Sequence, residues 1–234
     1  RWREASLVRW HDGSMRPVGG WTTRKASAFS YAPRAMLSFL DNSSDEYLVA
    51  GTYEKLYYVN PSLTVTDITP ASGFTSGTVN GALNTGFGGG FYGLNNYGRT
   101  PANSGVYAEA TTWALDTWGE YLLAVSSTDG KLLEWQGNPS ANAATVANAP
   151  TGNKSMVVTE ERFVFCLGAG GNPRKVAWSD KENNTVWTPS ATNEAGDMEL
   201  QTTGQIMCGV RMRGATLILT DNDAHVATYS GAPF

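Results

Sequence analysis

Apolar residues recur along the chain in short runs separated by polar turns, and alternation with a period of two is commoner than helical spacing. Three such runs make a unit, and four units follow one another. The predicted strands are 35–40, 47–50 and 55–59; 112–116, 121–125 and 131–135; 155–159, 163–167 and 174–178; and 206–210, 215–219 and 224–229. No stretch sustains apolar positions at helical spacing over three turns, so the sequence predicts an all-β protein.

The spacing of the units indicates a propeller-like arrangement of repeated antiparallel blades. The middle strands, aligned at Leu48, Leu122, Val164 and Leu217, are separated by 74, 42 and 53 residues. Two of these spacings fall near the roughly 40–50 residues of a propeller blade. The first is lengthened by an insert at residues 73–105 that holds ten glycines. The pattern fits four blades or part of a larger ring, within one domain over residues 1–234.

The glycine-rich insert reads as a long surface loop rather than a nucleotide site. No Gly-Lys-Ser/Thr ending follows its glycines, so a phosphate cradle is not expected. Long loops in compact domains are usually functional or flexible. Phe87, Phe91 and Tyr92 are interspersed with glycines here. We expect these aromatic side chains either to contact a partner or to lie on a surface loop that contacts no partner.

Basic and aromatic residues concentrate at the start of the chain. Residues 1–34 carry seven Arg and Lys residues against two acidic ones, a net charge of +5. Because the whole chain carries −4, the other 200 residues carry −9. A strand pair turning at residues 11–13 is expected here. Arg and Trp are enriched at interface hot spots, and the residues predicted to dock on a neighbouring protein are Trp2, Arg9, Trp10, Arg16, Trp21 and Arg24. An exposed basic strand pair or a nucleic-acid contact are the alternatives.

Composition gives little support to catalysis or metal binding. The chain contains two histidines and no Gly-x-Ser-x-Gly motif, so a Ser-His-Asp site and a histidine zinc site are not expected. Cys166 and Cys208 lie in apolar runs without a metal or redox spacing and are predicted to be buried free thiols. No catalytic residue, cofactor or metal is predicted. No run of eighteen apolar residues exists, and the first twenty residues lack an apolar signal-peptide core, so neither a membrane span nor a signal peptide is expected.

Several motifs, taken in order, resemble tail proteins of short-tailed bacteriophages. The opening strand, its Asp-Gly turn and the following Gly-Gly-Trp carry the likeness first, and it continues over essentially the whole chain. The matching segments are residues 2–13, 16–21, 51–57, 66–70, 113–120, 162–168, 173–180, 187–190 and 195–197, together with the glycine-rich insert. Each motif is weak alone, and their order makes the resemblance more specific.

The resemblance implies a nozzle or hub protein of the tail. Members of this group lie below the portal and its adaptor, form rings commonly of six copies, and retain and conduct double-stranded DNA without sequence specificity. It therefore implies a homo-oligomer in the virion, assembled in the host cytoplasm, with other tail proteins as partners and no enzymatic activity. Members are usually much longer than 234 residues, so it also implies that this sequence is part of a longer chain.

A carbohydrate-binding or glycan-cleaving propeller of a receptor-binding tail component is the alternative. Glycoside hydrolysis needs two facing carboxylates, and 21 acidic residues supply many candidates without a pattern that singles any out. A cluster of carboxylates and arginines around one end of the propeller would favour this alternative.

Overall fold

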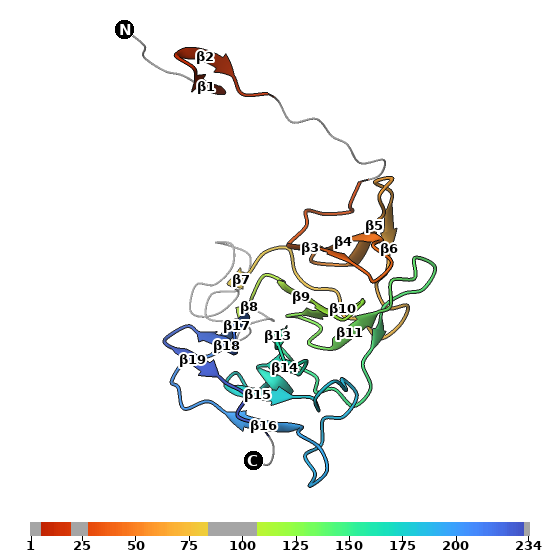
Figure 1. Cartoon of the computed structure of the whole chain (residues 1–234), viewed down its shortest axis with the longest axis vertical. Helices are drawn as coiled ribbons and strands as arrows, with labels where there is room; N and C mark the ends of the chain where they lie inside the picture. The colour runs from red at the N-terminus through yellow and green to blue at the C-terminus, as the bar shows by residue number, and fades with distance from the viewer. Residues whose placement is uncertain (1–5, 20–27, 84–106, 232–234) are drawn as a thin grey trace, which may run out of the picture.

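The computed structural model describes residues 6–19, 28–83 and 107–231, and their fold is all-β (Figure 1). Within these residues the only helical element is the short 3-10 turn η1 (Ala169–Gly171). The described strands form three four-stranded sheets, one three-stranded sheet and two two-stranded sheets, and every pairing is antiparallel. Among them, no helix is long and apolar enough to cross a membrane.

Each large sheet is a meander in chain order, and we number these sheets blade 1 to blade 4. Blade 1 contains β3 (Ala35–Leu40), β4 (Glu46–Gly51), β5 (Leu56–Val59) and β6 (Val65–Asp67). Blade 2 contains β9 (Trp113–Trp118), β10 (Tyr121–Ser126), β11 (Leu132–Trp135) and β12 (Ala144–Thr145). Blade 3 contains β13 (Ser155–Val158), β14 (Val164–Leu167), β15 (Lys175–Trp178) and β16 (Gly196–Glu199). Blade 4 contains β17 (Ile206–Met212), β18 (Ala215–Thr220) and β19 (Ala224–Ala227).

The first strands of the four blades lie around one cavity. Strand β9 contacts both β3 and β13, and β13 contacts β17. Residues from all four of these strands line a cavity of about 490 Å³. Meandering blades whose first strands surround a common centre are the arrangement of a β-propeller. The propeller-like fold expected from the sequence is confirmed.

Neighbouring blades pack face to face through apolar clusters. Val49 and Leu56 of blade 1 pack with Leu122 and Leu133 of blade 2. Between blades 2 and 3, Leu123 and Val125 pack against Met156 and Val164. Between blades 3 and 4, Val157 and Leu167 pack against Ile206 and Ile218. The strand β10 is buried on both faces because blades 1 and 3 cover it from either side. Strand β3 of blade 1 alternates half-buried and exposed residues, as expected for an end blade.

The predicted N-terminal strand pair is present as a hairpin of β1 (Val8–His11) and β2 (Ser14–Pro17), which stands apart from the blades in Figure 1. Its two-residue turn uses Asp12 and Gly13 with φ of 51° and 71°. Positive φ at both central positions is the geometry of a type I′ turn, which Asp-Gly favours. A second, two-residue pairing joins β7 (Ala82–Leu83) to β8 (Tyr107–Ala108). Residues 84–105 of the predicted insert lie outside the described residues.

The structure differs from the strand prediction in two ways. Blades 1 to 3 each have a short fourth strand, β6, β12 or β16, that the three-strand unit did not include. The last predicted strand, 224–229, ends at Ala227, and the chain then crosses to blade 3, where Tyr229 contacts Phe163.

Candidate functional site

A groove of about 410 Å³ lies between blades 3 and 4. Strands β14, β15 and β16 supply one wall, and β18, β19 and the residues after β19 supply the other. Large side chains on its walls are those of Phe163, Phe165, Trp178, Met198, Leu200, Ile218 and Tyr229. Glu161 lies among them and is half-buried. The groove therefore combines apolar walls with one carboxylate.

The groove opens beside a free strand edge. In the described residues blade 4 has three strands, whereas blades 1 to 3 have four, so β19 is the outer edge of its sheet. The N–H of Thr220 donates to the carbonyl of Asp223 at 2.9 Å and closes the β18–β19 turn. Hydrogen-bonded pairs alternate along an antiparallel ladder. His225 and Ala227 therefore point their backbone groups toward β18, and Ala224 and Val226 point theirs away from the sheet.

Polar contacts hold the two ends of this edge strand. The carboxylate of Asp223 accepts hydrogen bonds from the hydroxyls of Thr202 and Thr220 and lies 3.1 Å from Nε2 of His225. The Thr220 hydroxyl is the main reason that the pKa of Asp223 is lowered. After the strand, the Tyr229 hydroxyl donates to the Glu194 carboxylate at 3.0 Å. The β18–β19 turn and the chain that follows it are thereby tied to blade 3 and to the loop before β17.

The hairpin carries three of the residues predicted to form an interface. Arg9 and Arg16 are paired across it, and Trp10 pairs with Met15. The Arg9, Trp10 and Arg16 side chains are all exposed, Trp10 with 65% of its surface accessible. The other predicted interface residues, Trp2, Trp21, Arg24, Phe87, Phe91 and Tyr92, lie outside the described residues.

The central cavity has a different character. Its charged lining residues are Asp116 and Arg211. Asp116 accepts hydrogen bonds from the backbone N–H groups of Thr117 and Val158, at 2.8 and 2.9 Å, so its carboxylate joins blades 2 and 3. Among the described residues no group of three or more His, Cys, Asp or Glu side chains is placed to hold a metal ion.

The two cysteines are free thiols. Cys166 is buried as predicted, and burial raises the pKa of its thiol. Cys208 is half-buried instead of buried, because it lies on β17, the first strand of the last blade, where it lines the central cavity. The prediction of two buried thiols is therefore correct for Cys166 and wrong for Cys208.

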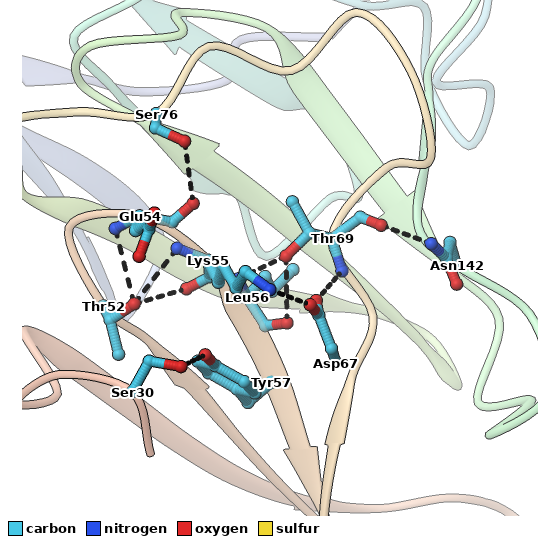
Figure 2. A network of polar contacts seen from close by, with 10 residues as sticks. All are labelled: Ser30, Thr52, Glu54, Lys55, Leu56, Tyr57, Asp67, Thr69, Ser76 and Asn142. Carbon is cyan, nitrogen blue, oxygen red and sulfur yellow. Dashed lines mark hydrogen bonds and ion pairs between the residues drawn. The ribbon is translucent and has the colours of Figure 1, made fainter.

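A network on blade 1 fixes the segment that follows the hairpin (Figure 2). The Tyr57 hydroxyl donates to Oγ of Ser30 at 2.9 Å, and the Phe29 ring contacts the Tyr57 ring edge-on. Lys55 and Asp67 form an ion pair of 2.7 Å across β5 and β6. Burial opposes ionisation of Asp67, yet hydrogen bonds from Lys55 and Thr69 leave its pKa lowered. Residues 28–34 are thus held on the outward side of blade 1.

Asn142 and Trp113 link the same network to blade 2. The Thr69 carbonyl accepts a hydrogen bond from the Asn142 side chain at 2.5 Å (Figure 2). Trp113, the first residue of β9, donates from Nε1 to the Thr52 carbonyl, also at 2.5 Å. Blades 1 and 2 are therefore joined by polar contacts as well as by their apolar cluster.

Comparisons with known proteins recover no family. No family model matches the sequence, and no curated protein matches it. Among solved structures, the chain is similar to the computationally designed Ika4 protein, with a TM-score of 0.48, 10% identity, and coverage of 90% of this chain and 99% of that one. It is also similar to BBS1N, solved in complex with ARL6DN, with a TM-score of 0.47, 15% identity, and coverage of 94% and 56%. For YCF48 bound to D1 peptide the TM-score is 0.47, the identity 13%, and the coverage 96% and 58%. The chain thus spans little more than half of the latter two.

Proposed function

We propose that this chain is a structural protein of a bacteriophage tail that assembles into a ring and performs no chemistry. The ring is a nozzle or hub of six copies below the portal and its adaptor, where it retains DNA and then conducts it outward. The location in the virion, the partner proteins and the number of copies in this proposal come from the resemblance of the sequence motifs to short-tailed phage tail proteins.

One structural observation carries the assembly part of the proposal: both end blades expose apolar side chains on their outward faces. On blade 4, Val226 is 61% exposed, and Val210 lies on the same face of the sheet. On blade 1, Leu40 of β3 is 63% exposed at the end of the strand, and Met36, 55% exposed, borders the central cavity, while Phe29 and Ser30 cover Tyr57 on the same face. Faces of this kind are buried at all three joints between successive blades. Exposed apolar patches on folded proteins mark interaction surfaces.

Charge supports a conduit rather than a DNA-coating protein. The 200 residues after the N-terminal segment carry a net charge of −9, which repels a phosphate backbone and limits its adhesion. The seven basic residues of the first 34 supply local positive charge that can hold DNA weakly while it waits. DNA binding by the chain is therefore expected to be weak, independent of sequence and sensitive to salt.

Immunogold electron microscopy tests the location directly. Antibodies raised against the purified chain are applied to intact phage particles from the source of the sequence and to particles whose tails have been removed. Gold confined to the tail, and absent from tailless heads, is the expected result. Labelling of host structures with unlabelled particles contradicts the proposal.

A further inference from the structure

The N-terminal hairpin has two chemically different faces, and none of the described blades covers either of them (Figure 1). Side chains alternate across a strand, so Val8 and Trp10 share one face with Met15 and Pro17. Arg9 and Arg16 lie on the other face. Trp10 is largely exposed, and a two-stranded hairpin without further packing is marginally stable in water. Burial of the apolar face of this hairpin against another surface would therefore stabilise it.

The hairpin has one open edge. The N–H of Val18 donates to the carbonyl of Leu7 at 2.7 Å, which fixes the alternation of the ladder. The backbone groups of Val8 and Trp10 on β1 therefore point outward, as do those of Met15 and Pro17 on β2. Because proline has no N–H, Pro17 blunts the β2 edge. Strand β1 is the edge that can accept another strand.

Strand β19 of blade 4 matches this edge. Both β1 and β19 are four residues long, and β19 presents the backbone groups of Ala224 and Val226. In an antiparallel pairing, like every other pairing in the described chain, residues with outward-pointing backbone groups face each other. Val8 and Trp10 then lie opposite Val226 and Ala224, on the outward face of blade 4, where Val226 is itself exposed.

The other face of the hairpin then enters the groove between blades 3 and 4. His225 and Ala227 line that groove, so Arg9, which alternates with Val8 and Trp10, takes the same side. The groove offers Arg9 the Glu161 carboxylate and the aromatic ring of Trp178. Arginine pairs with carboxylates and stacks on aromatic rings. The net charges of residues 1–34 and of the other 200 residues, +5 and −9, also attract each other.

We infer that the hairpin of one copy adds as a fourth strand to β19 of a second copy and places Arg9 over the groove beside Glu161. The hairpin is tethered to blade 1, where Ser30 binds Tyr57 and the N–H of Arg34 donates to Gly51. The contact therefore joins the first blade of one copy to the last blade of the next. Repeated head to tail, such a contact closes a ring. This inference rests on the proposed ring assembly and specifies its joint.

Two sets of variants of the 234-residue chain test the joint by analytical ultracentrifugation over a range of concentrations. Val226→Pro removes an outward N–H without touching the bonds to β18, and Val226→Thr is the matched control that keeps both the N–H and the shape. The proline variant is expected to weaken association at least tenfold, and the threonine variant less than threefold. Arg9→Glu and Glu161→Arg are each expected to weaken association about tenfold, and the double variant to recover it.

A cross-linking experiment separates a second copy from the chain's own hairpin. One copy carries Val8→Cys and another carries Val226→Cys, both with Cys208→Ser, since opposed residues of an antiparallel pair lie within disulfide range. Mixing the two under oxidation is expected to give a species of twice the mass. A chain that carries both cysteines and cross-links only within itself overturns the inference, as does the absence of any cross-link.

The results also distinguish this joint from the ring itself. Rings that form equally well from Val226→Pro and Arg9→Glu chains overturn the hairpin joint and leave the proposed assembly standing. Chains that stay monomeric at every concentration and form no cross-link contradict both.

Discussion

Trp113 provides a direct test of how the blades are joined. It is 8% exposed, it stacks on Phe74 with ring centroids 5.9 Å apart, and its Nε1 donates to the carbonyl of Thr52 on blade 1. It also lies flat against Gly51, where an added Cβ would stand 2.5 Å from its Cγ. Replacing Trp113 therefore removes packing and a hydrogen bond at the same joint.

The two contributions can be separated by two substitutions. Trp113→Phe keeps an aromatic ring but leaves the Thr52 carbonyl without this donor, which costs about 1–3 kcal/mol for a buried group. Trp113→Ala also empties the site, and large-to-small changes of this kind cost about 3–5 kcal/mol. We therefore expect a graded loss of stability, with Phe intermediate between Trp and Ala.

Urea denaturation followed by far-ultraviolet circular dichroism measures both losses. Trp10→Phe, at an exposed position, is the control and should change the free energy of unfolding by less than about 0.5 kcal/mol at low protein concentration. A Trp113→Ala chain as stable as the parent would refute the packing of blade 1 on blade 2 described above. Equal losses for Phe and Ala would assign the whole effect to the hydrogen bond.

Three further predictions concern burial, charge and close packing. A thiol reagent should label Cys208 in the native protein and reach Cys166, whose pKa is raised by burial, only after unfolding; equal labelling of both contradicts the fold. Asp67 has a lowered pKa, so the stability it provides is present at neutral pH and is lost as pH falls below about 4. Asp67→Asn should therefore cost up to about 1 kcal/mol at pH 7 and nothing near pH 2 in urea titrations. Gly209→Ala would bring a Cβ within 2.8 Å of Leu167 and should lower stability by about 1–3 kcal/mol in the same assay, and an unchanged midpoint would count against the joint of blades 3 and 4.

The inner three strands of each blade are readable from sequence because their side chains alternate between two covered faces or are apolar throughout. Strands β10 and β14 show this pattern as short, mostly apolar runs bounded by turns. The outer strands leave no such signal. Strand β12 has two exposed residues, and β16 carries Asp197 and Glu199 on an edge that water reaches. Each outer strand forms by hydrogen-bonding to the strand before it, and this pairing exists only in the folded blade.

Part of the candidate site could likewise be predicted from the sequence, and part of it could not. The basic and aromatic character of Arg9, Trp10 and Arg16 is visible in the sequence, and so is the Asp-Gly turn between their strands. The groove is not visible, because Glu161 and Trp178 of blade 3 meet β19 of blade 4 only after the blades pack. Which backbone groups face outward follows from hydrogen-bond register, and register is set by the folded hairpins.

Light scattering combined with negative-stain imaging tests the central claim most directly. The purified chain is measured at increasing concentration, and its mass is compared with the 25.1 kDa of one copy. The account predicts a concentration-dependent rise to about six times this mass, following the six copies that the resemblance implies, and images of rings with a central hole. A single-copy mass at every concentration, with compact particles and no rings, would contradict it.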